Sequence, residues 1–314
     1  MTEIRLPYGK TFQKAEIDNK RIQGVLVSKL EELVLEKSEE ELVQEALDNP
    51  IGTKRLEELA VGKEKVVILC SDHTRPVPSK ILIPAMLERI RKGNPDAKIT
   101  LLIATGCHRG TTQDELRGKF GDEIFENEDI YVHDCDDETL LAHKGILPSG
   151  GDIIVNKIAS EADLLVAEGF IEPHFFAGYS GGRKSVFPGC CSRQTVMYNH
   201  NAEFIDSPFA RTGILKDNPI HKDMIYAARQ LNLVFILNVV INAAKEIVHA
   251  VAGDLEEAHE AGPGTVDVVE DPRDLRPRRI GVGQQSGAVE PAPGIIPRDV
   301  GCSAVGKSHR RPQS

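Results

Sequence analysis

The 314-residue chain lacks the features that mark several specialised classes of protein. It has no C-x-x-C pair, and its six cysteines, at positions 70, 107, 135, 190, 191 and 302, follow no regular spacing. This pattern supports neither a zinc knuckle nor a disulfide framework, and it fits the reducing cytoplasm. The amino terminus lacks the apolar core of a secretory signal, and the longest apolar run, Leu231 to Ile241, is interrupted by Asn232 and Asn238. We therefore expect neither secretion nor a membrane span.

The chain also lacks an excess of positive charge, since its formal net charge is −10. Binding to a phosphate backbone needs a dense basic face, so we expect no nucleic-acid partner and take a small-molecule substrate as the default. The content of 40% apolar and 27% charged residues is typical of a soluble globular protein. The length suffices for one large domain or two ordinary ones.

Three apolar runs of strand length are each followed by a polar loop. The runs lie at 65–70, 99–104 and 163–167, and the loops at 71–78, 105–112 and 172–191. Helical patterns at 84–92 and 112–120 separate the runs. This alternation predicts an α/β fold, in which a mostly parallel sheet has flanking helices in a Rossmann-like arrangement. Because parallel strands end at one edge of a sheet, we expect the three loops to converge there.

Other elements are expected on either side of these strands. They are short strands at 3–6 and 21–26, a capped helix start at Ser38, a helix at 218–229, strands at 233–241 and 246–253, and a helix at 255–261. Pro84 is expected in the first turn of its helix, where proline is tolerated. From 263 to 314 the chain has 7 Pro, 7 Gly and no aromatic residue, which predicts an irregular, disordered tail.

Four histidines lie in or near the three loops. They are His73, His108, His174 and His200. Their positions at predicted strand ends favour a functional role for His108 and His174. For His73 the alternative is that it only fixes the turn around it. His200 lies near the end of an expected helix, and a single helical histidine is more often structural than ligating.

Asp72 and Arg75 share one tight loop. A guanidinium grips a carboxylate or a phosphate through two parallel hydrogen bonds, so Arg75 is a candidate clamp for an anion. The alternative is that the two side chains only pair with each other.

Residues 178–185 nearly match the P-loop pattern G-x-x-x-x-G-K-[ST], but Arg183 replaces the glycine before the lysine. A phosphate-binding or nucleotide-hydrolysing enzyme therefore stays open as an alternative. Locally, Ser180, Gly181 and Gly182 offer backbone N–H groups for an anion beside Lys184. Lys184 is then either a counter-ion for phosphate or a nucleophile that bonds covalently to a cofactor.

Four motifs, in this order and spacing, resemble the amino-terminal domain of the nickel-dependent lactate racemase (LarA) family. They are Asp72-His-Thr-Arg-Pro-Val-Pro78, Gly106-Cys-His-Arg109, Glu172-Pro-His-Phe-Phe-Ala-Gly-Tyr-Ser-Gly-Gly-Arg-Lys184 and Asn199-His200. The resemblance implies a lactate racemase-like isomerase that interconverts the enantiomers of a 2-hydroxy acid by hydride transfer to a nickel-pincer nucleotide. This cofactor is the nickel complex of pyridinium-3,5-bisthiocarboxylic acid mononucleotide, and the proteins of its biosynthesis are the implied partners.

The resemblance also implies a role for each matching residue. Lys184 would hold the cofactor covalently, and His200 would complete the coordination of nickel. His108 and His174 would be the paired acid and base, while Asp72 and Arg75 would line the cofactor and substrate site. The substrate chemistry agrees, because the α-hydrogen of a 2-hydroxy acid is too weakly acidic to leave readily as a proton. A hydride acceptor is therefore expected, together with a base for the hydroxyl proton.

The family has a second domain that supplies further substrate-binding groups, including a lysine, from a tyrosine-containing motif. This chain has no tyrosine after Tyr226 and only Lys307 in its tail. We therefore expect residues 1–262 to form the LarA-like catalytic and cofactor domain. Residues 263–314 would be an atypical tail in place of the second domain, through truncation or an out-of-frame ending. The alternative to an active racemase is then an inactive or cofactor-binding fragment.

Overall fold

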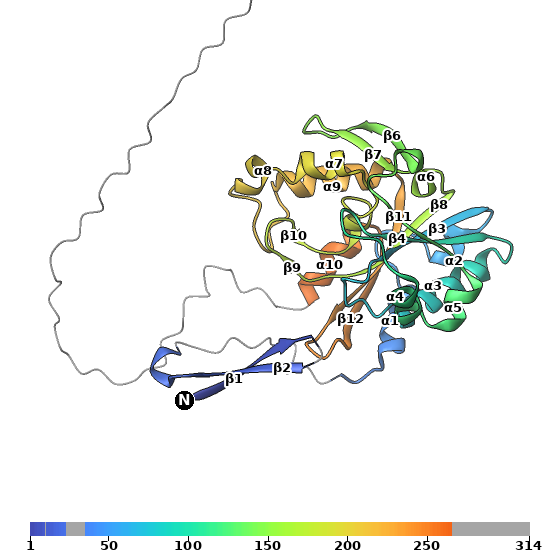
Figure 1. Ribbon diagram of the computed structural model, residues 1–314. Helices are drawn as coiled ribbons and strands as arrows, with labels where there is room; N and C mark the ends of the chain where they lie inside the picture. The colour runs from blue at the N-terminus through green and yellow to red at the C-terminus, as the bar shows by residue number, and fades with distance from the viewer. Residues whose placement is uncertain (10, 23–34, 266–314) are drawn as a thin grey trace, which may run out of the picture. The chain divides into compact units, whose positions relative to one another are not determined.

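The structure, a computed structural model, describes residues 1–9, 11–22 and 35–265. Its centre is a six-stranded sheet with the order β12-β11-β8-β3-β4-β5 (Figure 1). The strands are β3 (Lys65–Ser71), β4 (Lys98–Ala104), β5 (Asp129–Val132), β8 (Leu164–Phe170), β11 (Leu233–Ile241) and β12 (Ile247–Gly253). Neighbours from β11 to β5 are parallel, and β12 is antiparallel to β11. The predicted α/β fold with a mostly parallel sheet is confirmed.

The order of the strands reverses at the centre of the sheet. The chain adds β4 and β5 on one side of β3, and β8 and β11 on the other side. In open parallel sheets, ligands bind at such a reversal, in the crevice outside the carboxyl ends of the strands. The register pairs Val66 with Leu164 and Leu69 with Ala167, so β3 and β8 end at the same edge. The loops that leave β3 and β8 are therefore the expected walls of a site.

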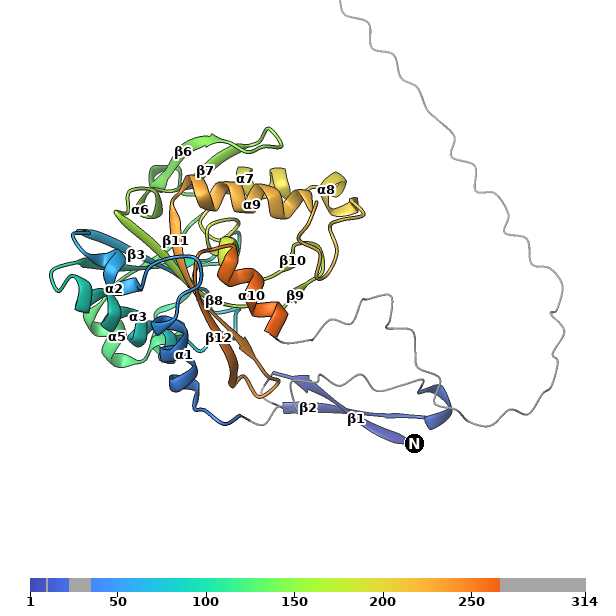
Figure 2. The same cartoon turned by 180° about the vertical axis from the view of Figure 1, so that it is seen from behind.

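Helices cover both faces of the sheet, as Figures 1 and 2 show from opposite sides. Successive side chains of a strand point to opposite faces, so Ile68 and Leu69 belong to two different cores. The first core includes α1 (Glu39–Asp48), α2 (Leu56–Ala60), α3 (Ser79–Gly93), α4 (Gln113–Phe120) and α5 (Asp122–Asn127). The second includes α6 (Lys157–Ser160), α7 (Arg193–Asn199), α8 (Ala202–Asp206), α9 (Pro219–Gln230) and α10 (Glu257–Thr265).

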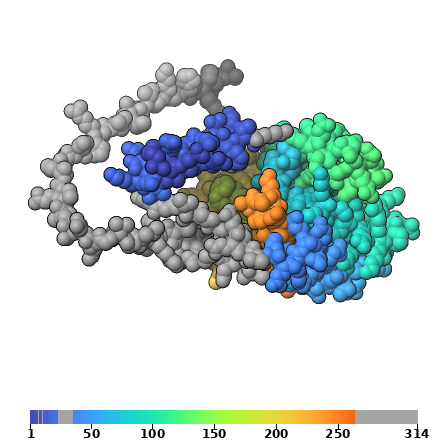
Figure 3. All heavy atoms as spheres, turned by 90° about the horizontal axis from the view of Figure 1, so that it is seen from below, coloured from blue at the N-terminus to red at the C-terminus, as the bar shows by residue number. Residues whose placement is uncertain are grey.

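Two helices begin where the sequence predicts. Ser38 and Thr112 each accept a hydrogen bond from the backbone N–H three residues later, and the side chains of Glu41 and Glu115 return one. Because these capping bonds are local, they are readable from sequence. Helix α1 then packs against β12, and the two lie side by side in the space-filling view of Figure 3.

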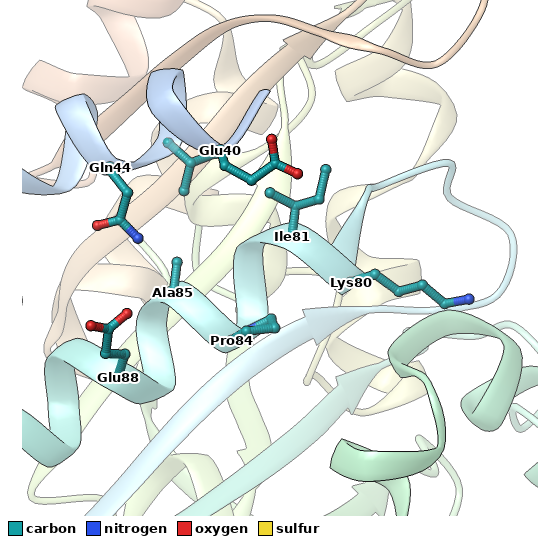
Figure 4. A pocket seen from close by; sticks show the side chains of 8 residues that line it. Glu40, Gln44, Lys80, Ile81, Pro84, Ala85 and Glu88 are labelled. Atoms are coloured by element: carbon teal, nitrogen blue, oxygen red, sulfur yellow. The ribbon is translucent and has the colours of Figure 1, made fainter. Parts of the chain in front are cut away.

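Pro84 does not lie in the first turn of its helix, so that prediction is wrong. Helix α3 begins at Ser79, five positions earlier, and continues through the proline. The ring removes the N–H that would bond to the Lys80 carbonyl. Burial of Leu82 and Ile83 against the sheet favours the longer helix and offsets this loss. Pro84 itself is exposed, and it lines a pocket between α3 and α1 that Figure 4 shows.

The remaining strands in the described part form two-stranded ribbons. They are β1 (Thr2–Tyr8) with β2 (Thr11–Ile17), β6 (Leu141–Ile146) with β7 (Asp152–Asn156), and β9 (Pro173–His174) with β10 (Gly178–Tyr179). The expected strand at 3–6 is confirmed, whereas β2 was not predicted. Of the strand expected at 21–26, Arg21 ends the 3-10 turn η1 (Asn19–Arg21), and residues 23–26 lie outside the described residues.

The later predicted elements are confirmed as α9, β11, β12 and α10. Helix α10 continues to Thr265, beyond the boundary expected at Gly262, and the predicted tail from 266 onward lies outside the described residues. In the part of the chain that is described, no helix is long and apolar enough to cross a bilayer. The five cysteines of this part are free thiols.

Gly189→Ala is expected to destabilise the fold. A Cβ at this position would lie 2.3 Å from the Ser185 carbonyl oxygen and 2.8 Å from the Ala104 Cβ. Overpacking of this kind costs about 1–3 kcal/mol, which urea unfolding would measure. Gly118→Ala is the control, because an added Cβ in α4 meets nothing within 4 Å. It should raise the free energy of unfolding by up to about 1 kcal/mol. Equal effects of the two variants would contradict the packing argument.

Candidate active site

The three predicted loops meet at the carboxyl edge of β3, β4 and β8. His108, after β4, places its Nδ1 2.6 Å from the Oδ2 of Asp72, after β3. Gly106 lies in the same loop as His108, and Gly189 lies in the loop after β8. The Gly106 N–H donates a hydrogen bond to the Gly189 carbonyl at 2.9 Å. The predicted convergence is therefore confirmed by contacts between the loops.

The contact between Asp72 and His108 orients an imidazole base. Asp72 is buried, while the His108 side chain is 45% exposed. Burial alone would raise the pKa of the Asp72 carboxyl, but hydrogen bonds from Thr74 and His108 outweigh it and lower the pKa. A carboxylate at this position keeps the imidazole proton on Nδ1, so the lone pair of Nε2 is available. The pair has the arrangement of a base held by a third group.

Arg75 does not form a side-chain pair with Asp72. The Asp72 carboxylate accepts hydrogen bonds from Thr74 and His108. The Arg75 side chain is exposed and forms no hydrogen bond with the described residues. Its charge lies within electrostatic reach of Glu172, His174 and Lys184. The alternative of self-pairing is therefore wrong, and Arg75 is a cation available to an anionic ligand.

Lys184 lies in the 3-10 turn η4 (Gly182–Ser185), with its Nζ 5.9 Å from the centre of the Phe176 ring. Burial, with Arg183 and Arg75 nearby, lowers the pKa of Lys184 to about 7. A large fraction of the side chain is therefore the neutral amine at neutral pH. A neutral amine is a nucleophile, whereas a counter-ion for phosphate needs the charged form. Of the two alternatives for Lys184, this environment favours the nucleophile.

His174 lies in β9, where its ring stacks on Phe175 and meets Phe176 edge-on. Burial and the charges of Lys184 and Arg75 lower the pKa of His174 to about 3, so the ring is neutral near pH 7. Its Nδ1 accepts a hydrogen bond from the Ala177 N–H at 3.2 Å, which puts the ring proton on Nε2. His108 therefore presents a proton acceptor at Nε2, and His174 presents a donor.

His200 follows α7 and packs against the rings of Phe176 and Phe187. Burial, together with Lys184, lowers the pKa of His200 to about 4. Its Nδ1 is buried and has no hydrogen-bond partner among the described residues. A neutral imidazole with a free nitrogen suits a metal ligand.

Ser180, Gly181 and Gly182 do not form an open anion cradle in this conformation. The Ser180 N–H donates to the carbonyl of Glu172 at 2.9 Å, and the Gly182 N–H donates to the Asn238 side-chain oxygen at 2.8 Å. A Cβ at Gly181 would lie 2.4 Å from the same Asn238 oxygen. Gly181 is thus explained by the close packing of the loop on β11, and Gly182 by packing on α10, where a Cβ would lie 3.0 Å from the His259 ring.

Arg183, which breaks the P-loop pattern, is fully buried. Its guanidinium donates to the Ala177 carbonyl at 2.8 Å and lies 2.9 Å from the Nε2 of His259. Burial lowers the pKa of Arg183 to about 9. In a P-loop this position is a glycine that lets the backbone wrap a phosphate. Here a side chain holds the loop together from within, which argues against nucleotide hydrolysis.

Three further histidine or carboxylate side chains remain to be placed. For His73 the sequence left two alternatives open, and Glu172 and His221 were not predicted as site residues. The Nδ1 of His73 lies 3.0 Å from the Thr111 hydroxyl, which supports the alternative that His73 fixes its turn. Glu172 was not singled out, although burial raises the pKa of its carboxyl near Arg75 and Lys184. His221 was also missed, and its Nδ1 is buried without a partner among the described residues. Glu172 could have been found from sequence, because it is the first residue of a motif that was already recognised. His221 could not, because a single histidine in a helix has no sequence pattern that marks it as functional.

Comparison with known proteins places the chain in a family. The model of the lactate racemase N-terminal domain matches residues 8–213, which is well over half of the chain. The chain belongs to this family. Curated lactate racemases from Thermoanaerobacterium thermosaccharolyticum and Lactiplantibacillus plantarum are 56% and 54% identical to it over 262 residues. Each alignment covers 83% of this chain and 62% of the relative, so the chain spans less than two thirds of the length of these relatives.

Solved structures give the same relationship. The lactate racemase apoprotein from Thermoanaerobacterium thermosaccharolyticum matches with a TM-score of 0.77 and 55% identity, over 84% of this chain and 62% of that one. A protein from Thermotoga maritima matches with a TM-score of 0.58 and 23% identity, over 73% of this chain and 59% of that one. The second likeness shows a shared fold only. The predicted resemblance to the lactate racemase family is confirmed.

Lys184 is expected to react with amine reagents at a lower pH than ordinary lysines. Because burial lowers the pKa of Lys184 to about 7, its labelling by trace acetic anhydride should be half-maximal near that pH. Exposed lysines, with a pKa of about 10.4, should still be far from half-maximal there. Peptide mass spectrometry of samples labelled across the neutral range would measure both. A labelling profile for Lys184 that matches those of the exposed lysines would contradict this prediction.

Acidification is expected to destabilise the chain. The pKa values of His174, His200 and His221 are lowered to about 3, 4 and 3, mainly by burial. Between about pH 6.5 and pH 4 the unfolded state binds protons that the folded state does not. Stability should therefore fall as the pH decreases, by up to about 1.4 kcal/mol per pH unit for each histidine. Urea unfolding across this range measures the slope, and His221→Gln should flatten it. Constant stability would contradict the prediction.

Proposed function

We propose that the chain is the catalytic and cofactor-binding part of a cytoplasmic, lactate racemase-like isomerase that interconverts the enantiomers of a 2-hydroxy acid. The observation that carries the proposal is the 2.6 Å contact between Asp72 and His108. It provides an oriented base beside the loop of Arg75, whose charge acts on His174 and Lys184. Membership of the lactate racemase N-terminal domain family supports the same activity.

Each functional group of a 2-hydroxy acid has a partner in this proposal. Arg75 binds the substrate carboxylate, because it is an exposed cation with no partner of its own among the described residues. The Nε2 of His108 accepts the hydroxyl proton, and the Asp72 carboxylate stabilises the imidazolium that results. These two contacts restrict the orientation of the substrate, and the position of the hydride acceptor is the third point that selects a face of the reacting carbon.

His174 serves the opposite enantiomer in this proposal. As placed, its Nε2 carries the proton and its Nδ1 accepts the Ala177 N–H. To act as a base at Nε2, the ring must release its Nε2 proton, take a proton at Nδ1 and give up the contact with Ala177. The two histidines are thus prepared for opposite directions of proton transfer, which suits a reaction that runs both ways.

The residues present fit a nickel-pincer nucleotide. The unpartnered Nδ1 of His200 is available to nickel, and the neutral amine of Lys184 is available for covalent attachment. Asp72 and the segment from Ser180 to Gly182, close to Lys184 in the chain, would line the cofactor, while Arg75 is left to the substrate. When bound, this cofactor supplies the hydride acceptor that racemisation of a 2-hydroxy acid needs. The proteins that make the cofactor are then partners of the chain.

In this proposal the catalytic and cofactor domain is residues 1–262, although the last described helix, α10, continues three residues beyond this boundary to Thr265. A second candidate function is cofactor binding without turnover. It is favoured by the neutral amine of Lys184 and the unpartnered Nδ1 of His200, which together suffice to hold the cofactor. The cofactor would then occupy the same site around Lys184.

Racemisation of D- and L-lactate by the chain, isolated from cells that make the cofactor, tests the proposal. His108→Gln and Asp72→Asn should each lower kcat/KM by about 100- to 10,000-fold, because both remove the oriented base. His143→Gln is the matched control, since the Nε2 of His143 lies 3.0 Å from Asp152 at an exposed position outside the three loops. Chiral chromatography would measure the rates, and a similar loss in the control would contradict the assignment.

Intact mass spectrometry of the same sample separates the two candidate functions. A mass adduct at Lys184 with bound nickel and racemisation supports the first candidate. The same adduct without racemisation supports the second. An unmodified Lys184, with no nickel bound, contradicts both.

A further inference from the structure

Glu168 is a fully buried carboxylate on β8, behind the candidate site. Its Oε1 accepts hydrogen bonds from the Ser71 N–H at 2.9 Å and from the Ser71 hydroxyl at 2.8 Å. Its Oε2 accepts one from the Ser79 hydroxyl at 3.0 Å. Ser71 is the last residue of β3, and Ser79 is the first residue of α3. The loop between them, which carries Asp72 and Arg75, therefore begins and ends on the two oxygens of one carboxylate.

Lys119 extends this cluster to the loop of His108. The Nζ of Lys119 donates to the Ser71 hydroxyl at 2.9 Å and lies 4.0 Å from Glu168, with only 7% of its side chain exposed. Lys119 belongs to α4, which follows the His108 loop directly. Arg109, next to His108, is held to α4 by two hydrogen bonds to Glu115, at 2.8 and 2.5 Å. Both loops that meet at the contact between Asp72 and His108 are thus anchored to the same buried ion pair.

Packing alone does not account for a charged residue at this position. A buried carboxylate loses its hydration, and an apolar side chain of similar volume is often equally stable or more so. The carboxylate differs from an apolar side chain in that its hydrogen bonds are directional. Its two oxygens hold Ser71 and Ser79 at a fixed distance from each other. The middle of the loop needs such support, because Thr74, Arg75 and Pro76 are exposed.

We infer that Glu168 is a positioning residue, which holds the two ends of the 72–78 loop and so places Asp72 against His108 and Arg75 at the site. This inference rests on the proposed function, because it concerns the geometry of the residues assigned to the substrate. The competing role is a stabilising one only, in which Glu168 contributes to folding and leaves the Asp72 and His108 geometry unchanged.

Glu168→Gln tests the inference because it keeps the side-chain volume and replaces one acceptor oxygen with a donor. Two readouts need neither cofactor nor turnover. The first is the Nδ1–H proton signal of His108 in the NMR spectrum of the ¹⁵N-labelled chain, which should be lost or move upfield. The second is amide hydrogen exchange of residues 71–79, which should become faster by about tenfold or more. In the loaded chain, kcat/KM should fall by about 10- to 100-fold through misplacement of Arg75 and His108.

Glu57→Gln is the matched control. Glu57 is a carboxylate with 12% exposure that accepts hydrogen bonds from Arg89 and Lys92, each at 3.3 Å, away from the loop. It should lower stability without changing the His108 signal or the exchange of residues 71–79. A folded Glu168→Gln with both readouts unchanged overturns the inference. If Glu168→Gln does not fold, Ser79→Ala is measured instead, because it removes a single hydrogen bond to Glu168. An unchanged His108 signal and unchanged exchange of residues 71–79 in Ser79→Ala would likewise overturn the inference.

The two proposals can fail separately in these experiments. Faster exchange and an altered His108 signal in a chain that never racemises lactate would support the role of Glu168 while the proposed activity fails. Absence of the His108 signal from the unsubstituted chain would count against the Asp72 contact and so against the proposed function. Hydrogen exchange of residues 71–79 would then decide the role of Glu168 by itself.

Discussion

The parallel pairing of β3 with β8 is the constraint on which the site depends. These strands are almost a hundred residues apart in sequence, yet their register, from Val66 opposite Leu164 to Leu69 opposite Ala167, brings their carboxyl ends to one edge. Both faces of the two strands are buried, which makes the register strict, because a slip of one residue would turn every side chain to the other face. The burial of apolar side chains in the sheet thus determines where the polar loops that follow β3 and β8 come together.

Burial also decides the chemistry of the loops once they have met. It disfavours the charged forms of Lys184, His174 and His200, so these groups are neutral or partly neutral near pH 7. Neutral bases can accept a proton, bind a metal or attack an electrophile, whereas their cations cannot. Arg75, by contrast, is exposed at the surface of the site. The site therefore combines exposed positive charge at Arg75 with several neutral nitrogen bases.

Sequence predicted the features that depend on local order and missed those that depend on distant neighbours. The strand runs, the caps at Ser38 and Thr112, and the convergence of the loops follow from short patterns. The helix through Pro84 does not, because the burial that offsets its lost hydrogen bond is tertiary.

The same distinction holds within the site. The motifs singled out His108, His174, Lys184 and His200, but the tautomers of the two candidate acid/base histidines depend on Asp72 and on the Ala177 N–H. The anion cradle expected from Ser180 to Gly182 failed because Asn238, more than fifty residues later, accepts one of its N–H groups.

The contact between Arg183 and His259 has a consequence for the modularity of the protein. His259 lies in α10, the last described helix, and its ring is within 2.9 Å of the guanidinium of Arg183, the neighbour of Lys184. A version of the chain that ended before α10 would remove this partner of the guanidinium, together with the contact of the His259 Nε2 with the Ser180 carbonyl at 2.7 Å. Helix α10 therefore packs as a part of the same structural unit as the loop that carries Lys184.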